Sequence, residues 1–191
     1  MSAGPFGART TLRVGGEAAE FVEVESLEQL RSLAGTFPGG RSFYVLGNGS
    51  NTLVADAGFD GVVLHLGEGF GEIQIEGTSI VAGGGADLPV IARRSVEAGL
   101  SGFEWAVGVP GTLGGAVAMN AGGHGSDLAA SLREVTIVDL RSGVLETRSA
   151  SEMAFGYRTS ALRSDEVVVS AVLDLAPGDP EVGRTQLREI V

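Results

Sequence analysis

The chain has 191 residues, of which 43% are hydrophobic and 19% charged. This is enough for one good-sized domain or two small ones, and it argues against intrinsic disorder. Thirteen Lys+Arg against 24 Asp+Glu give a net charge of −11, which disfavours nucleic-acid binding. All the cations are arginine and cysteine is absent, which excludes a P-loop lysine, Schiff-base chemistry, disulfides and thiolate metal sites. With only two histidines, we expect no metal centre.

No apolar run reaches the 18 residues typical of a membrane span. The N-terminal sequence 1–5 has neither the basic segment nor the apolar core of a secretory signal. We therefore expect a cytoplasmic protein with no membrane partner, and no obligate protein partner is evident.

Apolar periodicity and turn residues predict an α+β architecture with short sheets and few helices. Ser26-Leu-Glu-Gln29 is a capping box that begins the first helix, and Gly35 ends it. Asp87 is predicted to cap a second helix, with Pro89 in its first turn and Gly99 after its end. The expected strands are 19–25, 43–46, 62–66, 73–76, 79–82, 135–139, 144–148 and 167–175, and the expected helices are 26–34, 87–98 and 181–191.

The first candidate binding motif is Gly47-Asn48-Gly49-Ser50-Asn51, which follows a predicted strand. Successive N–H groups in a glycine-rich turn form a nest that binds phosphate oxygens without a cationic side chain. The motif is not the dinucleotide fingerprint, because Thr52 stands where a third glycine or alanine is needed. An ordinary tight turn is the alternative interpretation.

A second motif lies in the segment 102–125, which carries eight of the 31 glycines and is predicted to form loops and one short helix. So dense a glycine content indicates close approach of the backbone to a flat or phosphorylated ligand. All three asparagines of the chain lie in the two glycine motifs, although turn propensity explains part of that coincidence. The candidate residues here are Gly108, Val109, Pro110, Gly111, Gly114, Gly115, Asn120 and Gly122.

Arg158, in Tyr157-Arg-Thr-Ser160, is the third candidate. An arginine in a region of sparse cations can clamp an anionic substrate or stabilise developing negative charge, and a surface ion pair is the alternative. The segment His124-Gly-Ser-Asp127 contains the residue types of a hydrolytic triad. The residues of such a triad come from distant segments of a chain, so we favour a capped loop here. We interpret His65 as a structural histidine and Trp105 as a wall of the glycine-rich region.

Five ordered motifs give the chain a specific resemblance to the bacterial UDP-N-acetylenolpyruvoylglucosamine reductases, from about residue 9 to residue 175. The motifs are Thr11-Leu-Arg13-Val-Gly-Gly16 with Ala18, Leu46-Gly-Asn-Gly-Ser-Asn51 with Leu53 and Asp56, Gly99-Leu-Ser-Gly-Phe-Glu104, Gly108-Val-Pro-Gly111 through Met119-Asn120-Ala-Gly122, and Tyr157-Arg158-Thr-Ser160.

The resemblance implies a vanillyl-alcohol-oxidase-like fold in which two α+β lobes, 1–66 and 67–176, hold FAD between them. Residues 177–191 would then begin a linker to a third, substrate-binding lobe that this chain lacks. In that family NADPH reduces the flavin, and the flavin passes hydride to the enolpyruvyl double bond of a nucleotide sugar. The product is UDP-N-acetylmuramate, a peptidoglycan precursor.

The resemblance also implies a role for each candidate. The first motif, Gly47–Asn51, would cradle the FAD pyrophosphate, and the segments Gly108–Gly115 and Asn120–Gly122 would lie along the flavin and the adenosine. Arg158 matches the active-site arginine of the family, whose charge would favour the enolate-like carboxylate formed on hydride addition.

The family's proton-donating serine and its late glutamate follow the point where this chain stops. We therefore expect a partial chain that binds FAD and does not turn over substrate alone. Two alternatives stay open, namely a FAD-dependent alcohol or sugar oxidase of the same superfamily and a non-catalytic FAD-binding domain.

Overall fold

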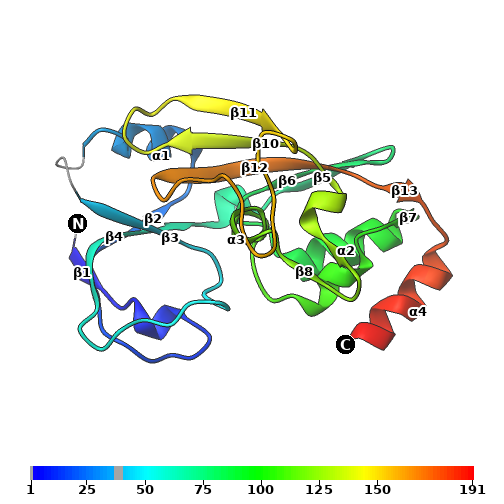
Figure 1. The fold of residues 1–191 in the computed structure, drawn as a ribbon, viewed down its shortest axis with the longest axis horizontal. Helices are drawn as coiled ribbons and strands as arrows, with labels where there is room; N and C mark the ends of the chain where they lie inside the picture. Colours follow the sequence, from blue (N-terminus) through cyan, green and yellow to red (C-terminus); the bar gives the residue numbers. More distant parts are fainter. Residues whose placement is uncertain (1, 37–40) are drawn as a thin grey trace.

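The computed structural model describes residues 2–36 and 41–191. Residues 1 and 37–40, which fall inside the predicted first lobe, lie outside the described part. The strands form two main sheets, and short helices are interspersed among them along the chain. Helix α1 lies near one end of the long axis, and α2 and α4 lie near the other (Figure 1).

The first sheet has the strand order β1-β2-β4-β3. β4 runs parallel to both β2 and β3, whereas β1 is antiparallel to β2. Val62, Val63 and Leu64 of β4 are all fully buried, as expected for a central parallel strand that is covered on both faces. The strands are β1 (Ser2–Gly4), β2 (Ala18–Val24), β3 (Ser42–Leu46) and β4 (Phe59–Leu66).

The second sheet is antiparallel, with the order β11-β10-β12-β6-β5. Two hairpins, β5–β6 and β10–β11, supply four of its strands, and the long β12 lies between them. The strands are β5 (Ile73–Glu76), β6 (Ser79–Gly83), β10 (Leu132–Asp139), β11 (Leu145–Ser149) and β12 (Glu166–Asp174).

Four α-helices and several short elements complete the described fold. The helices are α1 (Leu27–Leu33), α2 (Leu88–Glu97), α3 (Leu113–Met119) and α4 (Pro180–Ile190). The two-residue strands are β7 (Leu100–Ser101) with β13 (Ala176–Pro177), and β8 (Gly122–Gly123) with β9 (Ser126–Asp127). The 3-10 turns are η1 (Gly7–Arg9), η2 (Glu68–Phe70), η3 (Glu104–Gly108) and η4 (Leu128–Ala130).

An apolar core joins the two sheets. Leu30 of α1 and Leu64 of the first sheet belong to the same buried cluster as Val138 and Val167 of the second sheet. Burial of such side chains stabilises the fold by about 1.5–3 kcal/mol each. The two sheets are therefore packed on each other through side chains, so residues that follow strands of different sheets keep fixed relative positions.

The predicted start of the first helix at Ser26, which depends only on neighbouring residues, is confirmed. The Ser26 hydroxyl accepts from the Gln29 N–H at 3.2 Å, while the Gln29 side chain accepts from the Glu25 N–H at 2.8 Å. The second bond is displaced by one residue from the ideal capping box, which uses the N–H of the cap itself. The predicted strands all occur with boundaries shifted by a few residues, and the helix expected at the end of the chain is α4.

The predicted position of the second helix is confirmed, with Pro89 in its first turn. Asp87 is the N-cap residue of α2, but its side chain makes no capping hydrogen bond. Its Oδ1 instead accepts from Asn48 Nδ2 at 2.5 Å, a partner 39 residues away that local sequence does not reveal. The lobe boundaries after residues 66 and 176 stay predictions. Across the described ranges, no helix combines the length and apolar character that a membrane crossing needs.

Candidate functional site

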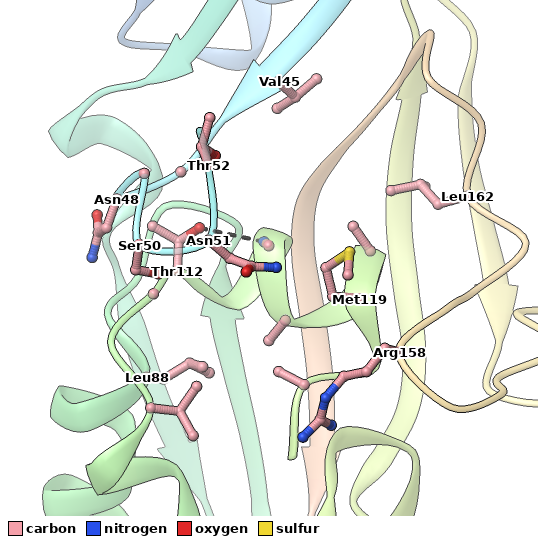
Figure 2. A pocket seen from close by; sticks show the side chains of 18 of the residues that line it. Val45, Asn48, Ser50, Asn51, Thr52, Leu88, Thr112, Met119, Arg158 and Leu162 are labelled. Atoms are coloured by element: carbon pink, nitrogen blue, oxygen red, sulfur yellow. Dashed lines mark hydrogen bonds between the residues drawn. The ribbon is translucent and has the colours of Figure 1, made fainter. Parts of the chain in front are cut away.

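A cavity of about 600 Å³ lies where the two glycine motifs meet. Its wall combines the turn after β3, the loop before α3, α3 itself and the loop between β11 and β12 (Figure 2). This size is in the range of cavities that hold cofactors and drug-sized ligands. Segments that follow or connect strands of both sheets thus line the cavity.

The turn Gly47–Asn51 forms one side of the cavity and is bonded to the opposite motif. The Asn48 amide donates to Asp87, and the Ser50 hydroxyl donates to the Pro110 carbonyl. At Gly47 a Cβ atom would come within 2.5 Å of Thr112 Oγ1, so a side chain would push the motifs apart. In Figure 2 Asn48 points away from the cavity, whereas Asn51 points into it.

The backbone of this turn has free donors. Within the described part of the chain, the N–H groups of Asn48, Gly49, Ser50 and Asn51 have no acceptor. Four successive amides without partners are a costly arrangement unless water or a ligand satisfies them. Adjacent amides of this kind form a concavity that suits an anion.

The second motif divides between the cavity and the core. The residues of this motif that line the cavity are Val109, Pro110, Gly111 and Gly115. Thr112 is the N-cap residue of α3, and its hydroxyl accepts from the Gly115 N–H at 3.3 Å. The close glycine spacing therefore brings backbone, rather than side chains, to the cavity wall.

Three of the predicted site residues do not line this cavity. A Cβ at Gly108 would lie 2.8 Å from Ile190 Cγ2, so the lack of a side chain at this position leaves room for α4 to pack there. Gly114 lies at a smaller neighbouring cavity and donates to the Gly84 carbonyl at 2.8 Å. Asn120 is 5% exposed, and its side chain is bonded within the protein. The other predicted residues, including Gly122, line the cavity.

Arg158 faces the cavity from the side opposite the Gly47–Asn51 turn (Figure 2). Its guanidinium donates to the carbonyls of Asn120 at 3.3 Å and Gly122 at 2.7 Å. No carboxylate of the described residues pairs with it, so the alternative of a surface ion pair is not what the structure shows. The guanidinium also lies over the Tyr157 ring, at 5.3 Å from its centroid. A guanidinium held by neutral groups alone keeps its full charge for an anionic ligand.

Sequence reasoning missed Arg163 and Glu166, which also line the cavity. The Glu166 carboxylate is bonded by Arg148 Nη2 at 2.5 Å and by Arg163 Nη1 at 3.0 Å. One available signal was a charged residue at the start of an apolar strand, because a buried carboxylate requires a cationic partner. The partner itself could not be found, since Arg148 is 18 residues away.

Two neighbouring carboxylates extend this ion-pair network. Hydrogen bonding from Arg141 holds the pKa of Asp165 below its usual value, against a smaller opposing effect of burial. Burial raises the pKa of Asp139, but hydrogen bonds from the backbone N–H groups of Ser142 and Arg141 outweigh it, so that pKa is also lowered. Arg163 bridges the pair, at 2.6 Å from Asp139 and 3.2 Å from Asp165.

We expect this network to make the fold sensitive to acid. Because both folded-state pKa values are lowered, the stabilisation is complete above the unfolded value of 3.8 and is lost as pH falls through the folded values. Thermal unfolding between pH 6 and pH 3 tests this. Asp165→Asn should lower stability by about 1 kcal/mol at neutral pH and weaken the loss below about pH 4. An unchanged acid profile in that variant would contradict the assignment.

The comparison with protein families shows to which family the chain belongs. Residues 18–148 match the family described as FAD binding domain. The chain belongs to the FAD-binding domain family. The expected α+β fold of the vanillyl-alcohol-oxidase type is confirmed, since solved structures of that fold superpose on the chain.

Curated members of the family show a more specific likeness. The chain is 39% identical over 178 residues to the UDP-N-acetylenolpyruvoylglucosamine reductase of Anoxybacillus flavithermus, covering 90% of this chain and 58% of that protein. It is 43% identical over 168 residues to the enzyme of the same name from Synechococcus sp., covering 86% and 55%. The chain thus spans a little over half the length of these relatives.

Two solved structures give the same result at the level of the fold. The UDP-N-acetylenolpyruvylglucosamine reductase of Thermus caldophilus superposes with a TM-score of 0.86 at 33% identity, covering 99% of this chain and 67% of that one. The berberine bridge enzyme of Eschscholzia californica reaches 0.60 at 14% identity, which is a likeness of fold alone.

Proposed function

We propose that the chain binds FAD in the cavity between the two glycine motifs and is the FAD-binding part of a UDP-N-acetylenolpyruvoylglucosamine reductase. The observation that carries this proposal is the run of four N–H groups, Asn48 to Asn51, that find no acceptor among the described residues, in a chain of the FAD-binding domain family. In an acidic protein without lysine, such amides are a means of binding a pyrophosphate without a salt bridge.

The residues of the cavity fit this cofactor. The Gly47–Asn51 turn offers donors to the pyrophosphate, and the backbone at Val109–Gly111 and Gly115 offers a flat, mostly apolar surface to the ring systems. Bound FAD would supply hydride transfer. Ser50 and Asn48 keep the two sides of the cavity joined through their bonds to Pro110 and Asp87.

Arg158 is proposed to bind the carboxylate of the enolpyruvyl group. Its charge would favour the enolate-like form that develops when hydride adds to the double bond, with NADPH as the ultimate reductant. The other change is protonation of the adjacent carbon, which gives UDP-N-acetylmuramate. Ser160 is not proposed as the proton donor, because its hydroxyl donates to the Ala118 carbonyl at 2.9 Å. The nucleotide-sugar substrate, NADPH and a cytoplasmic place in peptidoglycan synthesis all belong to this proposal.

Titration of the chain with FAD tests the proposal. We expect the flavin absorbance spectrum to shift and the flavin fluorescence to change in a saturable way. Arg158→Ala should retain FAD binding, because this side chain is assigned to the substrate, and should slow substrate reduction by about 10²–10³-fold in an intact reductase. A flavin spectrum that stays that of free FAD at saturating concentration would overturn the proposal, and oxygen consumption with an alcohol would instead favour the oxidase alternative.

A further inference from the structure

Asn120 ends helix α3 in a left-handed conformation, with φ 40° and ψ 58°. It is buried and does not line the cavity, although its motif is part of the predicted cofactor site. We infer that Asn120 is a positioning residue, which holds the turn that carries Arg158 rather than contacting FAD. This inference deepens the proposed function and rests on it for the role of Arg158.

The Asn120 side chain uses its donors and its acceptor within the protein. Its Oδ1 accepts from the Ala129 N–H at 3.0 Å, and its Nδ2 donates to Asp127 Oδ2 and to the Gly156 carbonyl, both at 3.1 Å. The amide therefore has no remaining N–H for a cofactor. The bond to Gly156 reaches across 36 residues of sequence and joins α3 to the loop between β11 and β12.

Gly156 is the first residue of a tight turn that contains Arg158. The turn is closed by the bonds Gly156 N–H to Thr159 O at 3.1 Å and Thr159 N–H to Gly156 O at 3.4 Å. Arg158 has φ 55° within it, a conformation that is strained for a side chain of this size. Such a turn persists only when its surroundings hold it, and the Asn120 side chain is one such support.

The main chain of Asn120 holds the other end of the arginine. Its carbonyl accepts from Arg158 Nη1 at 3.3 Å, beside the Gly122 carbonyl that accepts from Nη2. One residue thus fixes both the backbone from which Arg158 extends and part of its guanidinium. Ordering a long side chain before the ligand arrives reduces the entropy that binding must offset.

The test measures how tightly the Arg158 guanidinium is held. In the 191-residue chain, hydrogen exchange of arginine Nη–H groups is followed by NMR with ¹⁵N-labelled arginine, and the Arg158 signals are identified by their loss in Arg158→Lys. In the parent chain these protons should exchange more slowly than those of Arg188, an exposed arginine to which the described residues offer no side-chain hydrogen bond or ion pair. They should exchange faster than those of Arg148, whose side chain is 13% exposed and paired with two carboxylates, because Arg158 is exposed.

Asn120→Gly removes all three side-chain bonds while glycine tolerates the left-handed backbone. We expect Arg158 exchange to accelerate about tenfold, the effect of losing one hydrogen bond, while Arg148 changes less than about twofold. Asp127→Ala is the matched control, because it removes one Asn120 bond and leaves the bond to Gly156. It should leave Arg158 exchange within about twofold of the parent.

Unchanged Arg158 exchange in Asn120→Gly would overturn the inference, as would equal acceleration in Asp127→Ala. If Asn120→Gly does not fold, the parent chain still provides the test, since Arg158 protons that exchange as fast as those of the exposed Arg188 would contradict a held guanidinium. The exchange experiment needs no FAD. A chain that fails to bind FAD but shows the expected exchange pattern therefore supports this inference while overturning the proposed function.

Discussion

Replacing Gly49 by alanine is expected to destabilise the fold by about 3 kcal/mol and to abolish FAD binding. Gly49 has φ 64°, and a Cβ there would lie 2.7 Å from both the Arg9 carbonyl oxygen and Thr10 Cα. These are backbone atoms, so the overlap cannot be relieved by a side-chain rotation. The Gly49 carbonyl also accepts from the Thr11 N–H at 3.1 Å, and a displaced turn would lose that bond and the nest beside it.

Gly77→Ala provides the matched control. Gly77 has nearly the same backbone conformation, φ 60°, but nothing lies within 4 Å of a Cβ built there. This variant should lose only about 1 kcal/mol, which is the cost of the left-handed conformation. Urea unfolding and FAD titration measure both variants. If Gly49→Ala matches Gly77→Ala in stability and binds FAD like the parent, close backbone approach at Gly49 has no part in the site.

The second large effect is expected at Glu166, whose side chain is 1% exposed. Arg148 bonds both of its oxygens, with distances of 2.5 and 3.1 Å, and this contact raises the pKa of the Arg148 guanidinium. Glu166→Gln removes the buried partner of the largely buried Arg148 and leaves it only the half-exposed Glu146, so we expect a loss of about 3 kcal/mol of unfolding free energy.

Glu146→Gln is the control for this prediction, because Glu146 bonds the same Arg148 at 2.8 Å from a side chain that is 53% exposed. Its loss should change the unfolding free energy far less than the loss of Glu166, because an exposed ion pair is screened by water. The Glu166 variant should also weaken FAD binding, since the Arg163 N–H donates to Glu166 at 2.7 Å and thereby holds the cavity wall. Equal stability of the two variants would show that burial does not set the strength of this pair.

Features with local causes could be predicted from the sequence. The capping box at Ser26, the hairpin turn at Gly77 and the apolar strands depend on residues within a few positions of one another, and these predictions are confirmed. The approach of the glycine motifs to a phosphorylated ligand stays a prediction, and the structure shows Gly47 and Gly49 close to other residues of the protein, Thr112 and Thr10.

The partners of the polar side chains could not be predicted, because they depend on how distant segments pack together. Asp87 looked like a helix cap and instead bonds Asn48, while Asn120 shared a motif with cavity residues and instead holds the turn of Arg158. Glu166 stood out as a charged residue at the start of an apolar strand, but nothing in the sequence indicated that Arg148 is its partner. A hydrogen bond or ion pair depends on the position and direction of two side chains to within a fraction of an ångström, and only the packing of the two sheets and α3 sets those directions for residues that are distant in the chain.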